Sequence, residues 1–271
     1  MRVACVQSGV VYGDPVANVA QGIKRLRSLA DDGVDLAVFP ECYLTGYCVD
    51  SADEAKRIAI PLNHTSIQEW IEASVRWGIH SVVGYAGRDG EDVYNGACLI
   101  EPTGKVSEYR KTHLPELGLD RFVKQGSALP VFDTAIGRIG IAVCFDLRPP
   151  EVVRCLALQG AELVVLPTNW PEGAEFAPSF LAPVRANENR VFLASCNRIG
   201  TENGFRFIGR SGIWDVSGKT IASAGDGEET VVADIDLEQA KEKRVRTIPG
   251  KYETTVFESR RPELYDPIIR K

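Results

Sequence analysis

GIAVCFDLRPPE, residues 140–151, carries an apolar run into a turn and then into the beginning of a helix. The run 139–143 is typical of a buried strand, and the residues after Pro149-Pro150 predict a helix over 151–159. Cys144 stands at the junction of the two. Sheets of α/β proteins assemble sites from side chains at strand ends, so this stretch predicts an α/β fold with a candidate site at one sheet edge.

The same succession of strands and helices extends outward from this stretch in both directions. Turn signals at 102–105, around Gly137 and at 216–219 also predict antiparallel hairpins. Mixed sheets covered by helices fit this order. The expected strands are 3–7, 36–39, 81–85, 94–100, 106–110, 131–133, 139–143, 163–166 and 191–196, and the expected helices are 16–30, 66–77, 151–159 and 179–189.

Composition limits the class of protein. With 44% hydrophobic and 25% charged residues among 271, the chain is in the globular range, and no linker-like stretch divides it, so we expect one domain over 1–271. A net charge of −6 disfavours nucleic acid and anionic lipid as partners, which leaves a small molecule as the expected partner. No segment is long and apolar enough for a membrane span, and the N-terminus lacks the continuous apolar region of a signal peptide.

The cysteines indicate a compartment and argue against a metal. Seven cysteines form no C-x-x-C pair, and only three histidines accompany them, which disfavours a structural zinc site. An odd number of thiols without a disulfide pattern favours a reducing compartment, so we expect a cytoplasmic protein.

Three reactive side chains each follow an apolar run. Glu41 lies in VFPECYLTGY (38–47), Lys111 in EYRKTHLP (108–115), and Cys144 in the stretch quoted first. A cysteine attacks carbonyl carbon as its thiolate, which a nearby ammonium stabilises and which a carboxylate can generate by accepting the proton. Together the three residue types are sufficient for acyl transfer.

The chain resembles the nitrilase superfamily of carbon–nitrogen hydrolases over nearly its whole length. The resemblance rests on the ordered succession of VACVQ (3–7), FPE, RKTHLP, CFDLRPPE, RANENRVFLASCNRIG (185–200), GRSGIWDVSGKTIASA (209–224) and RRPELYDP (260–267). It implies an αββα sandwich with mixed sheets that pairs through its sheet-covering helices into homodimers or larger assemblies. We expect the tail from about 245 to 271 to pack on the domain or on a partner subunit.

The resemblance also implies a mechanism without a cofactor or metal. Glu41 would take the thiol proton of Cys144, whose sulfur attacks a small-molecule amide to give a thioester. Lys111 and the backbone N–H of Phe145 would stabilise the oxyanion. Glu41 would then protonate the departing ammonia and activate the water that hydrolyses the thioester.

The remaining site residues are less strongly specified by the sequence. The family's second glutamate has two candidates: register favours Asp120, and residue type favours Glu116. Asp146 and Arg148 either contact substrate or only form the turn and the helix start. Loop side chains that could line a substrate pocket are Tyr43, Asn169, Trp170, Glu172 and Phe176.

Several functions stay open at this point. Phe-Asp after Cys144 resembles the amidase-like branches of the superfamily, which implies amides as substrates, whereas N-carbamoyl amines and nitriles are alternative substrates within the superfamily. His113 lies two residues beyond Lys111 and could instead form a Cys–His dyad with Cys144. A binding scaffold without catalysis is the alternative of another class, since a fold does not fix a function.

Overall fold

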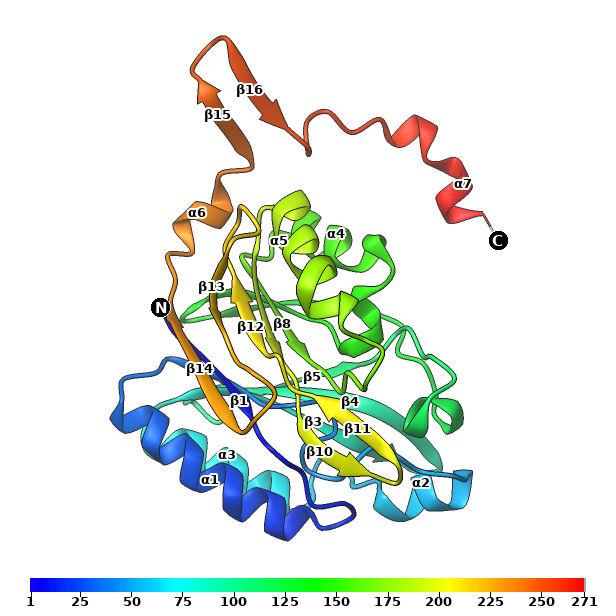
Figure 1. The fold of residues 1–271 in the computed structure, drawn as a ribbon. Coiled ribbons are helices and arrows are strands. Elements are labelled where there is room, and N and C mark those ends of the chain that lie inside the picture. Colours follow the sequence, from blue (N-terminus) through cyan, green and yellow to red (C-terminus); the bar gives the residue numbers. More distant parts are fainter. Residues whose placement is uncertain (271) are drawn as a thin grey trace.

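Two six-stranded mixed sheets form the centre of the molecule, which a computed structural model describes over residues 1–270 (Figure 1). Parallel pairs lie in the middle of each sheet and antiparallel pairs flank them. The first sheet has the order β14 (Glu229–Asp234), β1 (Arg2–Gln7), β2 (Leu36–Val38), β3 (His80–Asp89), β4 (Asp92–Ile100) and β5 (Val106–Arg110). The second has the order β13 (Thr220–Ser223), β12 (Gly212–Trp214), β9 (Phe192–Cys196), β8 (Leu163–Pro167), β7 (Gly137–Ile141) and β6 (Val131–Thr134).

Strand alternation explains why the sheets stack. In β2, Leu36 and Val38 join the cluster between the sheets, whereas Ala37 joins the cluster under the helices. Successive side chains of a strand point to opposite faces, so an apolar run such as this one is buried on both sides. Ile139 and Val165 face Leu36 and Val38 from the second sheet in the same inner cluster. Each fully buried aliphatic side chain of this kind stabilises the fold by about 1.5–3 kcal/mol.

Helices α1 (Pro15–Asp31) and α3 (Thr65–Trp77) cover the outer face of the first sheet. Asp14 caps α1 by accepting the Ala17 N–H at 2.9 Å. Gly78 ends α3 in the left-handed conformation, which glycine adopts without strain. Trp70 of α3 packs edge-on against Phe39, just beyond β2. Figure 1 shows both helices lying side by side below this sheet.

Helices α4 (Pro150–Leu158) and α5 (Ala182–Asn189) cover the outer face of the second sheet, where Val152 and Leu156 enter a third cluster. These layers give the predicted αββα sandwich, which is thereby confirmed. The helix expected over 179–189 begins three residues later, because a π-helical turn, η3 (Ala177–Leu181), precedes it.

Several elements were not predicted from the sequence. Within residues 1–236 they are α2 (Ala52–Ile58), the 3-10 turns η1 (Gly118–Phe122) and η2 (Cys144–Leu147), the π-helical turn η3, the hairpin β10 (Ile199–Glu202) with β11 (Phe205–Ile208), and strand β14. Strand β14 pairs antiparallel with β1, so residues more than two hundred positions apart share one sheet edge. No local pattern encodes a pairing of that separation.

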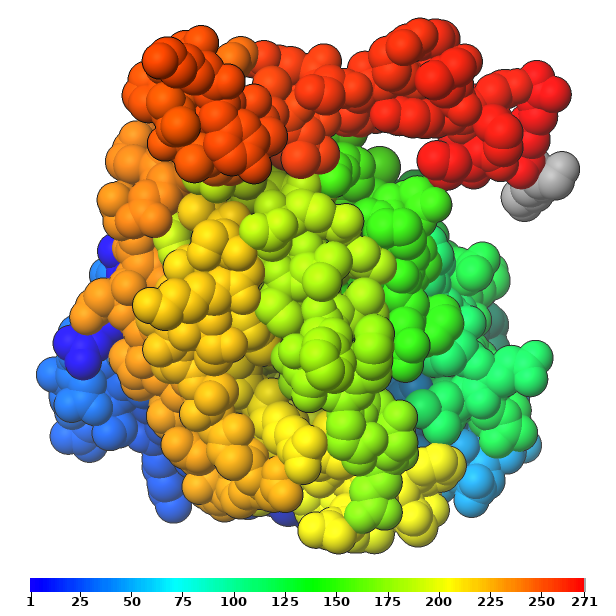
Figure 2. All heavy atoms as spheres, turned by 45° about the horizontal axis from the view of Figure 1, so that its top comes forward, coloured from blue at the N-terminus to red at the C-terminus, as the bar shows by residue number. Residues whose placement is uncertain are grey.

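The C-terminal tail leaves the sandwich at α6 (Glu238–Lys241) and forms the hairpin β15 (Arg244–Ile248) with β16 (Tyr252–Thr255). It then crosses above α4 toward α7 (Asp266–Ile269) and appears as a separate ridge in Figures 1 and 2. Phe257 is held against the body between Arg154 and Lys243, whose charged groups lie 5.1 and 5.3 Å from its ring centroid. Ile269 is 81% exposed, so the end of the tail has little contact with the body.

Within residues 1–270, no helix has the length and apolar character required to span a bilayer. The same residues contain no group of three or more His, Cys, Asp or Glu side chains arranged to hold a metal ion.

Candidate active site

Glu41 lies in a tight turn that follows β2 and rests on β3. Leu44 donates its N–H to the Gly84 carbonyl of β3 at 3.1 Å, and Cys42 adopts a left-handed φ of 49°. A Cβ on Gly84 would lie 2.5 Å from the Cys42 nitrogen and 2.8 Å from the Glu41 Cα. Glycine is therefore required at residue 84 for the turn to approach the strand.

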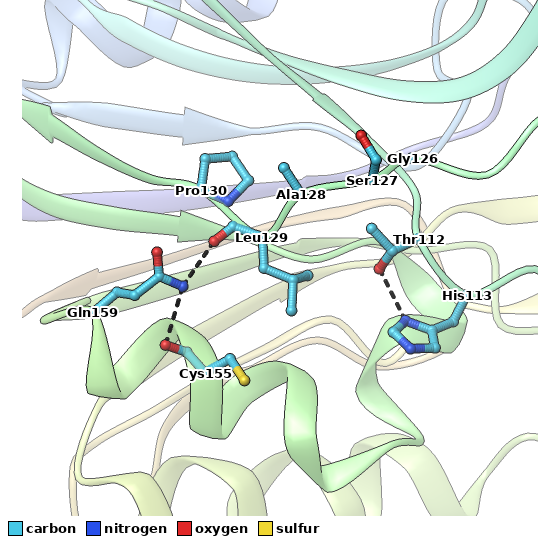
Figure 3. Close-up of a pocket in the computed structure, with 9 residues that line it drawn as sticks. All are labelled: Thr112, His113, Gly126, Ser127, Ala128, Leu129, Pro130, Cys155 and Gln159. Carbon is cyan, nitrogen blue, oxygen red and sulfur yellow. Dashed lines mark hydrogen bonds between the residues drawn. The ribbon is translucent and has the colours of Figure 1, made fainter. Parts of the chain in front are cut away.

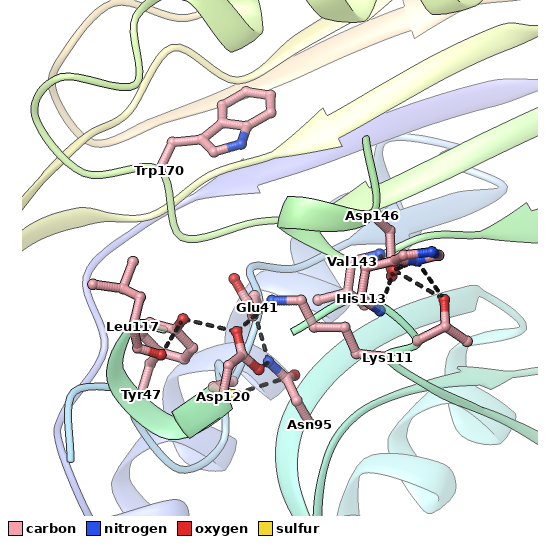
Figure 4. Close-up of polar contacts among 12 residues, drawn as sticks. Glu41, Tyr47, Asn95, Lys111, His113, Leu117, Asp120, Val143, Asp146 and Trp170 are labelled. Atoms are coloured by element: carbon pink, nitrogen blue, oxygen red, sulfur yellow. Dashed lines mark hydrogen bonds and ion pairs between the residues drawn. The ribbon is translucent and has the colours of Figure 1, made fainter. Parts of the chain in front are cut away.

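Lys111 follows β5 directly and is completely buried. Its Nζ donates to Glu41 Oε1 at 2.8 Å and to Asp120 Oδ2 at 2.6 Å, as Figure 4 shows. Asp120 reaches the ammonium from the turn η1 and is itself buried. One cation thus lies between two carboxylates, and all three side chains are buried.

Two residues that the sequence analysis missed complete this cluster. Asn95 of β4 donates through Nδ2 to Glu41 Oε1 at 2.7 Å and to Asp120 Oδ1 at 2.9 Å. The Tyr47 hydroxyl lies 2.8 Å from Asp120 Oδ2. A signal for Asn95 was present in the predicted hairpin of 94–100 with 106–110. In the structure Ile100 pairs with Val106, and continuing that register places residue 95 opposite Lys111. No comparable signal exists for Tyr47.

Cys144 begins the turn η2, which follows β7 of the second sheet, and its φ is 47°. A non-glycine residue in this region is strained, and such strain persists only where the surrounding structure enforces it. Asp146 holds the Cys144 backbone in this conformation, because its Oδ2 accepts the Val143 N–H at 2.9 Å and its own N–H donates to the Val143 carbonyl at 3.0 Å. The nucleophile candidate is thus held from the sheet opposite to Glu41 and Lys111.

The protonation states in the cluster follow from burial and charge. Burial raises the pKa of Glu41 above its ordinary value, with Asp120 adding to the rise and Lys111 opposing it. Burial alone would lower the pKa of Lys111, but the Asp120 and Glu41 carboxylates hold that pKa well above its usual value. The lysine is therefore a permanent cation.

Cys144 differs from the sequence-based expectation of a thiol made acidic by the ammonium. Burial, followed by the charge of Glu41, raises the pKa of Cys144 to about 12, and the lowering effect of Lys111 does not compensate. The thiol is consequently protonated near neutral pH, and it needs a base at the moment of attack.

A cavity of about 310 Å³ opens directly above Cys144. Its walls are largely apolar, which suits a small organic molecule. Asn169 is 1% exposed, and neither its amide nitrogen nor its amide oxygen has a hydrogen-bond partner among residues 1–270. The lining residues are Tyr47, Pro115, Leu117, Cys144, Phe145, Leu147, Arg148, Asn169, Trp170, Pro171, Glu172, Gly173, Ala174, Ala177 and Leu181.

Figure 3 shows a second cavity, of about 560 Å³, which has no lining residue in common with the first. Thr112, His113, Cys155, Gln159 and the loop 126–130 line it, and Cys144 does not. His113 turns its Nδ1 toward Asp146 Oδ1 at 2.9 Å. It lines this second cavity, so the geometry gives no support to a Cys144–His113 dyad.

The structure shows which of the other site residues expected from the sequence lie near Lys111 or Cys144. Asp120 contacts Lys111, whereas Glu116 is exposed in the loop. Arg148, Asn169, Trp170 and Glu172 line the cavity above Cys144, as does Phe145, the expected source of an oxyanion N–H. Glu172 is also paired with Arg206 at 2.9 Å.

Two of the expected pocket contacts are wrong. Tyr43 is buried in the core, where its ring packs against Phe39 and Trp70. Phe176 is exposed beside Phe180 and does not line the cavity. For Asp146 the structure supports the alternative of a turn-forming residue: its side chain is fully buried, accepts the Val143 N–H, and does not line the cavity above Cys144.

Comparison with known proteins places this geometry in a family. The sequence profile of the carbon–nitrogen hydrolases matches residues 2–245. A nitrilase of Pyrococcus abyssi is 33% identical, with 98% of the chain and 99% of the relative aligned, and an (R)-stereoselective amidase of a Pseudomonas species is 34% identical, with 90% and 88% aligned.

A solved structure of the amidase from Nesterenkonia sp. AN1 has a TM-score of 0.77 and 26% identity over 90% of the chain and 96% of that protein. In that structure, a glutamate-to-glutamine variant, acrylamide has added to the active-site cysteine. Profile, relatives and fold agree, and the chain belongs to the carbon–nitrogen hydrolases of the nitrilase superfamily.

Proposed function

We propose that the chain hydrolyses small linear amides to a carboxylic acid and ammonia through a thioester on Cys144. The observation that carries this proposal is the arrangement of Glu41. Its Oε1 accepts from Lys111 and Asn95, while the buried Oε2 has no hydrogen-bond partner among residues 1–270. One carboxylate oxygen is thus fixed in place, and the other is free to exchange a proton.

In the first half-reaction, Glu41 accepts the thiol proton as the Cys144 sulfur bonds to the amide carbonyl carbon. The oxygen becomes an oxyanion, for which Lys111 and the Phe145 N–H are the donors. Fixed donors in a water-excluding site favour the transition state by several kcal/mol, because they need no reorganisation. The C–N bond then breaks, and the amine nitrogen takes the proton back from Glu41, leaving the thioester.

In the second half-reaction, Glu41 removes a proton from a water molecule that attacks the thioester carbon. The C–S bond breaks, the acid departs, and the proton returns to the Cys144 sulfur. The raised pKa of Glu41 supports this alternation, since a group that is base in one step and acid in the next works best with a pKa close to the working pH.

The relatives support amide chemistry and also favour a second candidate. The Pseudomonas relative and the Nesterenkonia protein are both named as amidases, and the Michael adduct of acrylamide in the Nesterenkonia structure indicates a nucleophilic active-site cysteine there. The Pyrococcus relative is named as a nitrilase, so nitrile hydrolysis by the same three residues is the second candidate. Hydrolysis of N-carbamoyl amines is a further variant of the same chemistry.

Ammonia release from matched amides, nitriles and N-carbamoyl amines tests the proposal. We expect amides to be the fastest class, and the Cys144→Ala variant to be inactive while folded. Mass spectrometry of the quenched enzyme should find an acyl adduct on the Cys144 peptide, formed more slowly by Glu41→Gln. Faster hydrolysis of each nitrile than of its matching amide would reject the amidase assignment, and an adduct on Cys42 or Cys48 would reject the nucleophile.

A further inference from the structure

The buried carboxylate of Asp146 links the two halves of the site through five polar contacts. Oδ2 accepts the Tyr109 hydroxyl at 2.7 Å and the Val143 N–H at 2.9 Å. Oδ1 lies 3.0 Å from the Thr112 hydroxyl, 3.0 Å from the His113 N–H and 2.9 Å from the His113 ring nitrogen. Asp146 is fully buried and does not line the cavity above Cys144.

These donors come from the segments that carry the reacting groups. Tyr109 precedes Lys111 by two residues, and Thr112 and His113 are the two residues that follow it. Val143 is the residue before Cys144. The first group belongs to the end of the first sheet and the second to the end of the second sheet. Figure 4 shows Asp146 and His113 on one side of Lys111, with Glu41 and Asp120 on the other.

We propose that Asp146 is a positioning residue that fixes the Cys144 turn relative to the Lys111 segment, so that the sulfur and the oxyanion donor meet one substrate carbonyl. This inference rests on the proposed function. Asp146 has no contact with the substrate cavity, so its effect reaches the reaction through Lys111 and Cys144.

The chemistry of the donors makes a carboxylate necessary at this position. The carboxylate accepts hydrogen bonds from two backbone N–H groups and from two side-chain hydroxyls. An ionised acceptor binds such donors more strongly than a neutral one does. An amide at the same place would turn an N–H₂ group toward at least one of them. Misplacement of reacting groups by about 1 Å can lower a rate by on the order of 100-fold.

Asp146→Asn tests the proposal, with Glu162→Gln as the matched control. Glu162 is also a buried carboxylate that accepts a backbone N–H, from Arg138 at 2.9 Å, but it lies outside the site. With a simple aliphatic amide as substrate, we expect Asp146→Asn to lower kcat by roughly 10- to 100-fold and to change KM by less than about threefold. Glu162→Gln should change thermal stability without a comparable loss of kcat.

A second readout does not need a substrate. Iodoacetamide alkylation of Cys144, followed by peptide mass, should slow in Asp146→Asn and stay at the wild-type rate in Glu162→Gln. If Cys144 of the wild type is alkylated rapidly but the enzyme hydrolyses no amide, the proposed function fails. The alkylation rates of the two variants would still test the positioning role. Equal kcat losses in the two variants, or a loss confined to KM, would overturn the positioning role.

Conservative changes on the lysine side keep the test decisive if Asp146→Asn does not fold. Thr112→Val and Tyr109→Phe each remove one donor while keeping the size of the side chain. We expect each to lower kcat severalfold with little change in KM, and each to have a smaller effect when Asp146 is already replaced. Normal kcat in both variants would show that Asp146 holds only its own turn.

Discussion

At the scale of single residues, Asp120 and Glu116 differ most sharply. Asp120 Oδ2 lies 2.6 Å from the Lys111 ammonium, whereas Glu116 is exposed in the same loop. We expect Asp120→Asn to lower turnover by roughly tenfold or more, because it removes the charge that holds the ammonium in place. Glu116→Gln, the same chemical change four residues earlier, should have little effect. Equal losses, or a larger loss for Glu116→Gln, would contradict this prediction, which steady-state kinetics on a single amide can check.

The pH dependence of kcat/KM should report Glu41. Its carboxylate must be ionised to accept the thiol proton, and its pKa is raised in the folded protein, so kcat/KM should fall on the acid side at a pH above the ordinary value for glutamate. The negative charge of Asp120 contributes to that rise. Asp120→Asn should therefore move the acid limb to lower pH in profiles measured from about pH 4 to about pH 9. An acid limb that stays in place would show that another group is being titrated.

At the scale of elements, the approach of the Glu41 turn to β3 gives a sharp steric prediction. A methyl group on Gly84 would meet the backbone of Pro40, Glu41 and Cys42, and backbone cannot swing away as a side chain can. We expect Gly84→Ala to displace Glu41 and to lower kcat by on the order of 100-fold. Gly225→Ala is the control, because nothing lies within 4 Å of its added Cβ. Normal turnover in Gly84→Ala, with Tm measured alongside, would exclude this constraint.

Elements with local signals were predictable, and contacts between distant segments were not. Strand β2 and the hairpin of β4 with β5 follow from apolar runs and a turn signal that lie within a few residues of one another. The direction of the loop after Glu41 depends on the left-handed Cys42 and on Glu202, which accepts the Tyr47 N–H from 155 positions away. For that reason the sequence suggested Tyr43 for the cavity, where the structure has Tyr47.

In the candidate site, too, residues with a local sequence signal were predictable and residues placed by long-range contacts were not. Glu41, Lys111 and Cys144 each end an apolar run, so strand-end reasoning and the family resemblance both identified them. Asn95 lies inside a strand, and nothing in its immediate neighbours distinguishes it from an ordinary buried polar residue. Only the register of the hairpin, carried through to Lys111, indicates its position.

At the scale of the whole molecule, the helical face of the second sheet predicts self-association. Phe176 and Phe180 are 56% and 59% exposed with ring centroids 5.2 Å apart, and Val184 is exposed beside them in sequence. Exposed apolar groups gathered in one region mark interaction surfaces. We expect a homodimer in sedimentation experiments, which Phe180→Glu weakens. Val16→Glu, the same charge added to an exposed apolar position on α1, should leave it intact. A monomeric wild type would refute this prediction.

The chain passes from the first sheet to the second only once before Cys144, through the loop between Lys111 and β6. Ser127 and Ala128 are exposed in that loop. A single cut between them would divide the protein into one piece with the proton carrier and the ammonium, and another with the sulfur. Each piece alone would lack part of the proposed set of reacting groups. The surfaces that reunite the pieces would be the inner apolar faces of the sheets and the edge of β1, which pairs with β14 from the second piece. If the proposed amide hydrolysis holds, ammonia release regained on mixing two separately expressed pieces would measure the number of reunited molecules. The enzyme would then be a candidate split reporter.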